Sequence, residues 1–300
     1  MSYQAARTSA ALIERTDRAV TRLHGRDPVR MIQGLVSNDV ANAPIDTSVY
    51  ATFLTPKGRM IGDARVMRRP DNDVWIEADI NALANIEAHL KKSVPPLFAR
   101  AQRMSDVRVI GVYGPLSTEV EMASELRLAT SDTGDTGIDF VVRGDVALPN
   151  LPRLSFEELE VLRIETGTPR WGAELTEDVI PLEAGLRHIA ISESKGCYTG
   201  QEVIIRILHR GHVNRHLRGL LLGAAPVPAR DATIAHGDKN VGKVTSACVS
   251  PLLQQAIAMG YVRREVEPGT TVVIDGREAR VVELPFEKQE HEGISRIRSA

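Results

Sequence analysis

Lys195-Gly196-Cys197-Tyr198-Thr199-Gly200-Gln201-Glu202 is the most informative stretch of this chain. It places one of only two cysteines close to a lysine, and an apolar, helix-like run follows at residues 203–208. If this run is a helix that opens near Gly200, its unbonded N–H groups and its dipole face the loop that carries Cys197. A helix N-terminus and a nearby cation both lower the pKa of a thiol. The stretch therefore predicts a reactive cysteine, with a half-buried cysteine in a tight turn as the plainer alternative.

The composition limits the class of protein. A chain of 300 residues with 43% hydrophobic content buries a sizeable core, and its length predicts two or three domains. The 37 basic and 39 acidic residues nearly balance, which gives no reason to expect a nucleic acid or an anionic membrane as partner. Cys197 and Cys248 belong to no CxxC motif or Cys/His cluster, so we expect no resident metal and no disulfide scaffold.

The first hundred residues predict an α+β unit with an antiparallel sheet. Short strands are expected at residues 12–14 and 19–23, and a helix from Asp27-Pro28 to about Leu35. Residues 50–54 and 60–67 flank the turn sequence Thr55-Pro56-Lys57-Gly58, which is typical of a hairpin. A strand at 74–77 and an amphipathic helix through Ile80, Leu83, Ile86 and Leu90 complete the pattern.

A second α+β unit and a β-rich end follow. A strand at 107–112, a helix at 115–128, a strand at 140–142 and a capping box at Ser155 and Glu158 are expected. From Leu217 onwards short strands alternate with glycine turns, and Asp275-Gly276 indicates a tight hairpin. We therefore predict two α+β lobes with antiparallel sheets, at residues 1–105 and 106–215, a C-terminal β-barrel at 216–288 and a frayed tail at 289–300.

The chain resembles the YgfZ-type folate-binding proteins, which are relatives of the glycine cleavage T protein (aminomethyltransferase) and of a mitochondrial iron–sulfur assembly factor with the same fold. The resemblance runs from the N-terminal strands to Phe286. The stretch around Cys197 is its most specific block and separates the two branches, whereas the earlier blocks are shared with the T protein. The earlier blocks are Gln33-Gly34-Leu35-Val36-Ser37-Asn38-Asp39-Val40, Phe53-Leu54-Thr55-Pro56-Lys57-Gly58-Arg59, Arg163-Ile164-Glu165-Thr166-Gly167 and Pro181-Leu182-Glu183-Ala184-Gly185-Leu186.

This resemblance implies three lobes around a central opening that receives tetrahydrofolate or a substituted folate. It also implies a role in the assembly or repair of 4Fe–4S proteins, with effects on tRNA modification through iron–sulfur enzymes. The expected partners are then folate, iron–sulfur assembly proteins and their client enzymes, without direct contact to nucleic acid or membrane. The family architecture predicts a monomer, and the cysteine content and the lack of any signal-peptide or membrane-span pattern predict a cytoplasmic protein.

Several residues are candidates for the folate site. A pterin ring presents N–H donors that a carboxylate accepts, and the resemblance gives this role to Glu165, with Arg163 beside it. Tyr198 is a candidate to stack on the ring. Arg206 and Arg210 belong to a basic stretch that could hold the glutamate tail of folate or an anionic partner, or could form a solvated connector.

Asp63 is a candidate for both folate binding and catalysis. In the T protein an acidic residue after the corresponding hairpin lies near the folate nitrogen that takes up the one-carbon unit. Here Gly62 stands where the T protein often has a first aspartate, which counts against aminomethyl transfer. An ion pair of Asp63 with Arg65 or Arg59 is the plainer alternative.

Cys197, with Lys195 beside it, is the other candidate catalytic centre. It could ligate iron or a cluster transiently, together with ligands from a partner, or it could act as a redox thiol that Lys195 keeps ionised. Our leading hypothesis is a folate-binding accessory factor for iron–sulfur protein maturation, and whether it has turnover of its own is left open. The alternative is a folate-dependent aminomethyl or methyl transferase.

Overall fold

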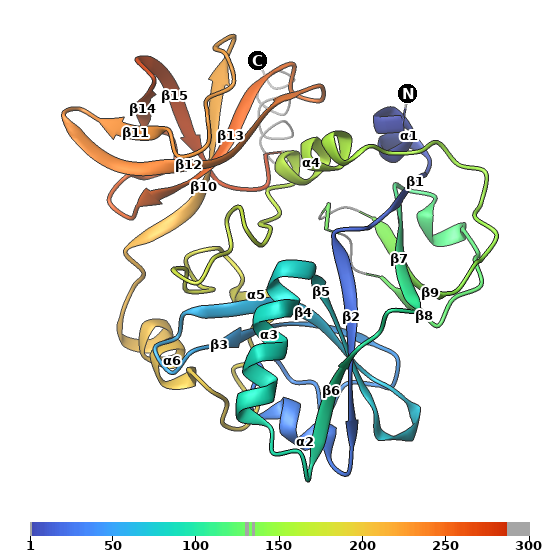
Figure 1. Ribbon diagram of the computed structural model, residues 1–300. Coiled ribbons are helices and arrows are strands. Elements are labelled where there is room, and N and C mark those ends of the chain that lie inside the picture. The colour runs from blue at the N-terminus through green and yellow to red at the C-terminus, as the bar shows by residue number, and fades with distance from the viewer. Residues whose placement is uncertain (1, 130–131, 134–135, 287–300) are drawn as a thin grey trace, which may run out of the picture. The chain divides into compact units, whose positions relative to one another are not determined.

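The computed structural model describes residues 2–129, 132–133 and 136–286 of the chain. Its strands build two open antiparallel sheets and one closed barrel, as Figure 1 shows. The predicted α+β class with a C-terminal barrel is confirmed. The predicted tail at 289–300 lies outside the described residues.

Both open sheets are antiparallel throughout. The first has the order β3-β4-β5-β2-β6 and consists of β2 (Arg18–Gly25), β3 (Ser48–Leu54), β4 (Met60–Arg68), β5 (Val74–Asp79) and β6 (Ala99–Arg103). The second has the order β1-β7-β9-β8 and consists of β1 (Ala11–Glu14), β7 (Val107–Tyr113), β8 (Leu126–Leu128) and β9 (Gly137–Arg143). The N-terminal strand β1 therefore completes a sheet whose other strands come about a hundred residues later.

The helices are short, and most flank the sheets. They are α1 (Ser2–Thr8), α2 (Pro28–Gln33), α3 (Ile80–Ser93), α4 (Phe156–Glu165), α5 (Arg187–Ala190) and α6 (Gln201–Arg210), with single 3-10 turns at Pro70–Asn72 and Ser117–Glu119. The predicted capping box is confirmed, because Ser155 and Glu158 exchange side-chain hydrogen bonds with each other's backbone N–H at the start of α4.

The predicted helix at 115–128 is wrong. Residues 117–119 make only one 3-10 turn, and β8 occupies the end of the segment. In β8 the side chains of Leu126 and Leu128 are buried while Arg127 is exposed, which is the two-residue period of a strand. Burying both leucines while pairing the backbone with β9 outweighs the helical tendency of the segment.

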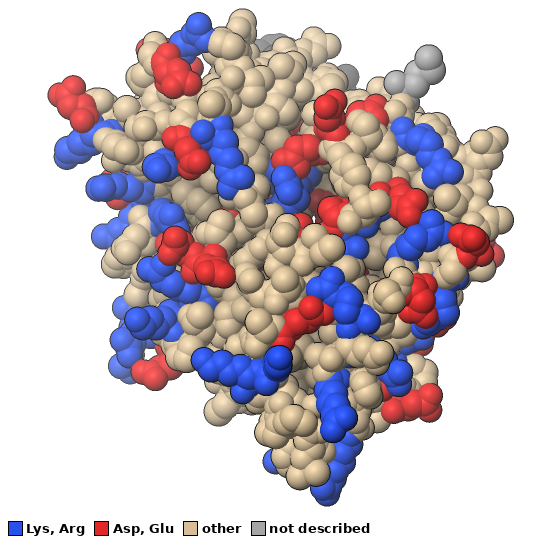
Figure 2. All heavy atoms as spheres, viewed as in Figure 1, with Lys and Arg blue, Asp and Glu red and all other residues tan. Residues whose placement is uncertain are grey.

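The chain divides into two compact units. In the described residues, the two-sheet unit contains residues 2–129, 136–153 and 175–212, and the barrel unit contains 132–133, 154–174 and 213–286. The lobe boundaries predicted at residues 105 and 215 remain predictions. The surface carries charges of both signs, and Figure 2 shows basic and acidic side chains interspersed on one face, in agreement with a formal net charge of −2.

In the two-sheet unit the sheets share an apolar core. Met67 and Trp75 of the first sheet pack in one cluster with Val109 and Val141 of the second. The opposite face of the first sheet is covered by α3 (Figure 1), which approaches β4 closely at Gly62. A Cβ atom at Gly62 would lie 3.0 Å from the Ile86 side chain and 3.2 Å from the backbone oxygen of Ala82.

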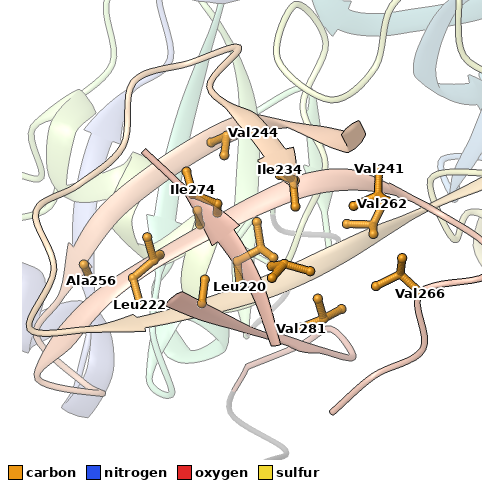
Figure 3. Close-up of a cluster of buried hydrophobic side chains, with 13 residues drawn as sticks. Leu220, Leu222, Ile234, Val241, Val244, Ala256, Val262, Val266, Ile274 and Val281 are labelled. Carbon is orange, nitrogen blue, oxygen red and sulfur yellow. The ribbon is translucent and has the colours of Figure 1, made fainter. Parts of the chain in front are cut away.

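The barrel unit is a six-stranded antiparallel barrel with α4 packed on β12 and β13. Its strands are β10 (Arg215–Gly223), β11 (Thr233–His236), β12 (Lys239–Ser250), β13 (Gln255–Arg263), β14 (Thr271–Ile274) and β15 (Arg277–Val282). Figure 3 shows the interior, where small and branched aliphatic side chains such as Leu220, Val244 and Ile274 point toward one another. The predicted hairpin at Asp275-Gly276 is confirmed, and both residues have positive φ.

Candidate functional site

Asp63 lies on β4, on the face of the first sheet that points toward the second sheet. Because side chains alternate along a strand, residues 63, 65 and 67 all lie on this face. Met67 packs in the shared core, and Arg65 pairs with Asp139 of β9 at 2.5 Å. Asp63 is only 8% exposed. Its carboxylate therefore lies at the polar end of the interface between the two sheets.

Tyr50 holds this carboxylate, and it is a residue that the sequence analysis missed. Its hydroxyl donates a hydrogen bond to Asp63 Oδ2 at 3.0 Å. In the β3–β4 register Tyr50 pairs with Arg65 and Thr52 pairs with Asp63, so Tyr50 and Asp63 are diagonal neighbours that a long side chain can bridge. The hairpin pattern alone does not give this pair, because a β-bulge between Phe53 and Leu54 shifts the register of the two strands.

Gly62 lies on the opposite face of the sheet, against α3. The departure from the T protein at this position therefore removes no carboxylate from the face that carries Asp63. The sequence argument against aminomethyl transfer loses its force, because a side chain at 62 would point at Ala82 and Ile86.

A buried ion network continues from this face. Glu77, which is fully buried, accepts hydrogen bonds from Arg18 and Arg65, and Asp139 accepts from Arg65 and from the hydroxyl of Tyr113. Burial alone would raise the pKa of Glu77, but the two guanidinium groups outweigh burial and lower that pKa to about 2. Through the Arg65–Asp139 pair, the network joins the first sheet to the second close to Asp63.

Lys195 points away from solvent and is 8% exposed. Its Nζ donates to three backbone carbonyl oxygens, those of Gln33 at 2.7 Å, Val36 at 2.7 Å and Asn38 at 2.9 Å. Burial lowers the pKa of Lys195 to about 8 against the opposing charge of Asp39, yet three donated hydrogen bonds require the protonated ammonium. The three N–H groups of Lys195 are thus engaged with carbonyls, which leaves none for the Cys197 sulfur.

Cys197 itself is exposed at the apex of the loop between Lys195 and α6. Its role as a reactive thiol remains a prediction, and the cation that was expected to ionise it is occupied elsewhere. Cys248, on β12, is half-buried, and burial raises the pKa of its thiol to about 12. Of the two cysteines, Cys197 is the more exposed.

Tyr198 is buried beside the lysine. It is 7% exposed, and the Lys195 ammonium lies 5.2 Å from the centre of its ring. Within the described residues its hydroxyl has no hydrogen-bond partner, and burial, with a smaller contribution from Glu193, raises its pKa to about 12. The predicted stacking of Tyr198 on a pterin remains a prediction, and the ring face toward Lys195 is already covered by the cation.

Gly200 is the N-cap of helix α6, as expected, and α6 packs on the β3–β4 hairpin. Gly200 has φ +83°, and a Cβ atom there would lie 2.6 Å from the backbone oxygen of Thr55. A Cβ atom at Gly58, in the hairpin turn, would lie 2.9 Å from Val203 of α6. These two glycines bring the Cys197 loop against the hairpin that carries Asp63 on its second strand.

The predicted basic residues of α6 are on the surface. Arg206 has a side chain that is 71% exposed and pairs with Glu202 at 3.0 Å, and Arg210 is also exposed. Both are available to an anionic group in solution. Their binding of a folate tail remains a prediction.

Arg163 and Glu165 lie in the barrel unit, not in the two-sheet unit that carries the other candidates. All five N–H donors of Arg163 have acceptors inside the barrel unit: Glu160 twice, Thr168 O, Glu174 and Ser246. Glu165 is fully buried and accepts from the hydroxyl of Ser250 at 2.5 Å and from Leu252 N at 3.3 Å. The geometry disfavours Arg163 as a folate ligand, while the role of Glu165 stays a prediction.

No group of three or more His, Cys, Asp and Glu side chains is arranged to hold a metal ion within the part of the chain that the structure describes. None of the described helices is long and apolar enough to span a membrane.

Comparison with known families identifies two segments. The family described as "GCVT N-terminal domain" matches residues 2–141, and the family described as "Glycine cleavage T-protein C-terminal barrel domain" matches residues 215–288. Together the two matches cover more than two thirds of the chain, in the order that the resemblance predicts.

Individual proteins that are similar to this chain agree with the two family matches. The chain is 27% identical to the aminomethyltransferase of Rubrobacter xylanophilus, over 95% of this chain and 85% of that protein. It is 26% identical to the aminomethyltransferase of Moorella thermoacetica, over 95% of this chain and 88% of that protein. The crystal structure of glycine cleavage system aminomethyltransferase T from Bartonella henselae has the same fold, with a TM-score of 0.83, 20% identity and coverage of 95% of this chain and 88% of that one. These relatives favour the transferase alternative over the iron–sulfur hypothesis.

Proposed function

Because this chain belongs to the glycine cleavage T-protein family, we propose that it binds a reduced folate in its two-sheet unit and transfers a one-carbon unit to or from that folate. The observation that carries this proposal is the Asp63 carboxylate, which is nearly buried and oriented by the Tyr50 hydroxyl. Its relatives are named aminomethyltransferases, which supports aminomethyl transfer as the reaction.

The chemistry of the pair fits this reaction. As the folate nitrogen forms its bond to the methylene carbon of the aminomethyl group, the bond from that carbon to the amino nitrogen breaks and the amine leaves as ammonia. The folate nitrogen also loses its proton, and a carboxylate within hydrogen-bond reach is a suitable acceptor. The Tyr50 hydroxyl donates to Oδ2 and thereby fixes the orientation of the carboxylate. Asp63 is the proposed proton acceptor, and Tyr50 is a positioning residue.

The test combines binding and turnover. Purified protein is titrated with 5-formyltetrahydrofolate by calorimetry and then assayed with tetrahydrofolate and an aminomethyl donor of the glycine cleavage system. We expect the Asp63→Asn variant to lose about a hundred-fold or more in turnover. The Asp145→Asn variant, which changes an exposed aspartate, should match the unchanged protein. Absence of folate binding by the unchanged protein would refute the proposal.

A second candidate function is favoured by one observation, the exposed Cys197 within the block from Lys195 to Glu202. Folate-dependent transfer does not need a thiol, whereas a YgfZ-type accessory factor for iron–sulfur protein maturation carries this block. In this reading the partners are iron–sulfur assembly proteins and client enzymes in the cytoplasm, and the chain acts as a monomer.

Complementation separates the two functions. A bacterial strain that lacks its YgfZ-type protein receives this chain, its Cys197→Ala variant or its Asp63→Asn variant, and iron–sulfur tRNA-modifying activity is assayed. Rescue by the unchanged chain but not by Cys197→Ala supports the accessory role. No rescue at normal expression, together with turnover in the enzymatic assay, supports the transferase alone.

A further inference from the structure

The loop that carries Cys197 is bound to one segment of the first sheet's periphery, residues 33–38, on both sides of the thiol. Before Cys197, Ser192 N donates to Ser37 O at 3.0 Å, and Lys195 Nζ donates to three carbonyls of the segment. After Cys197, Thr199 N donates to Gly34 O at 3.1 Å. The position of the exposed thiol is therefore set by where residues 33–38 lie.

The same segment is bound to Tyr50. Asn38 Nδ2 donates to the backbone oxygen of Tyr50 at 2.9 Å, while the backbone oxygen of Asn38 accepts from Lys195 at 2.9 Å. The Tyr50 hydroxyl in turn donates to Asp63. Asp63, Tyr50, Asn38 and Lys195 thus form one continuous chain of contacts that ends two residues before Cys197.

Lys195 is the rigid part of this chain of contacts. Lys195 is 8% exposed, and its ammonium donates to three carbonyl oxygens in place of water. A shift of residues 33–38 without a matching shift of Lys195 would therefore leave a buried cation short of acceptors. Moving the Cys197 loop together with residues 33–38 costs less free energy than breaking these hydrogen bonds, because Gly196 and Cys197 are exposed to solvent. A displacement at Asn38 is therefore passed on to the thiol.

We propose that Asn38 and Lys195 couple the Asp63–Tyr50 pair to the Cys197 loop, so that a folate bound at Asp63 changes the reactivity of the Cys197 thiol. This inference rests on the proposed folate site. A folate that donates to Asp63 competes with the Tyr50 hydroxyl for the same carboxylate. The coupling requires that the displaced Tyr50 side chain shift the Tyr50 backbone oxygen, which accepts from Asn38. Lys195 acts here as a positioning residue and not as the base that ionises the thiol.

The experiment measures the rate at which iodoacetamide alkylates Cys197, with and without saturating 5-formyltetrahydrofolate. Peptide mass spectrometry separates Cys197 from Cys248, because trypsin cleaves between them. Folate affinity is measured by calorimetry on the same samples. The variants are Lys195→Met, Asn38→Ala and, as a matched control, Lys91→Met, which changes an exposed lysine at the end of α3.

In the unchanged protein and in Lys91→Met, we expect folate to change the alkylation rate about five-fold or more. In Lys195→Met and Asn38→Ala, folate should still bind within about three-fold of the original affinity, while the effect on Cys197 disappears. Asn38→Ala keeps the inference testable if Lys195→Met does not fold, because it removes the contact to Tyr50 and leaves the ammonium in place.

Two results would overturn the coupling: folate that binds without changing the alkylation rate, or an effect that persists in both variants. Absence of folate binding in the unchanged protein refutes the proposed function instead, so the two failures are distinguishable. A purely structural role for Lys195 predicts changed alkylation in the absence of folate together with an intact folate effect, which also contradicts the proposal.

Discussion

Glu77 is a fully buried charge in the first sheet. Its carboxylate is fully buried between Arg18 and Arg65 and accepts a hydrogen bond from each. A buried carboxylate with two cationic partners stays ionised far below its ordinary pKa. Its pairing on β5 with residues of β2 and β4 makes it a fixed point of the first sheet.

The pKa of Glu77 predicts how stability changes in acid. Because this pKa falls from 4.5 to about 2 on folding, the contribution of Glu77 is complete above pH 4.5 and is lost as the pH falls toward 2. We expect the free energy of unfolding to lose roughly 3 kcal/mol from this group over that range. The measurement is urea unfolding at a series of pH values.

The Glu77→Gln variant tests the assignment. It should be less stable at pH 7 by about 3 kcal/mol, because two buried guanidinium groups lose their charged partner. Between pH 4.5 and 2 its stability should fall less steeply than that of the unchanged protein. An equal slope in both proteins would show that other carboxyl groups cause the acid unfolding.

Tyr50 permits a smaller change at the proposed site. Tyr50→Phe removes only the hydroxyl that donates to Asp63 and keeps the ring. A hydrogen bond to a charged group makes a net contribution that corresponds to about a ten-fold effect, so we expect turnover with folate to fall about ten-fold. Thermal unfolding serves as the control, and a large loss of stability with unchanged turnover would contradict a positioning role.

At the scale of elements, the contact between the β3–β4 hairpin and the start of α6 depends on glycine. Gly200 has a positive φ and no room for a Cβ atom beside Thr55. The positive φ and the lack of room for a Cβ atom have the same origin: the chain turns sharply after Cys197 and begins a helix against the hairpin. Gly200 of the Cys197 block and Gly58 of the hairpin block are therefore explained by packing.

Gly200→Ala should lower the free energy of unfolding by about 3 kcal/mol, because it adds a steric clash to a strained backbone. The matched control is Gly185→Ala, which has a similar φ of +76° but nothing within 4 Å of the added Cβ atom. We expect the control to lose only about 1 kcal/mol. Chemical denaturation measures both, and equal losses would mean that the close approach to Thr55 is unimportant.

At the scale of the whole molecule, the chain has separate hydrophobic cores. The interior of the barrel is a cluster of its own, and the two sheets share another. The chain divides into two compact units accordingly. Because each core excludes water by itself, we expect a substitution in one core to destabilise the unit that contains it and not the other unit.

Leu220→Ala tests this independence. Leu220 is fully buried in the barrel, so the cavity should destabilise the barrel unit by about 3 kcal/mol. Hydrogen exchange read by mass spectrometry should rise in β10 to β15, while amides of the two sheets keep their protection. Equal acceleration in both units would show that they unfold as one.

The sequence alone determined the elements whose signals are local. The Asp275-Gly276 hairpin, the capping box at Ser155 and the period of α3 depend on residues a few positions apart. The first two are confirmed, and the period of α3 is confirmed at Leu83, Ile86 and Leu90, while Ile80 is exposed. The order of the family blocks likewise determined the fold class. Polar β6 and short β8 were missed, because only pairing with β2 and β9 makes them strands.

Only the tertiary structure decided what the candidate residues do. Lys195 is two residues from Cys197 in sequence, but its ammonium binds carbonyls more than 150 positions away. Arg163 lies two residues before Glu165, and all its N–H groups donate to acceptors inside the barrel unit. Tyr50 contacts Asp63 because the register of β3 and β4 makes the two residues diagonal neighbours. A side chain's role follows from the groups that replace its water on burial, and those groups come from distant parts of the chain.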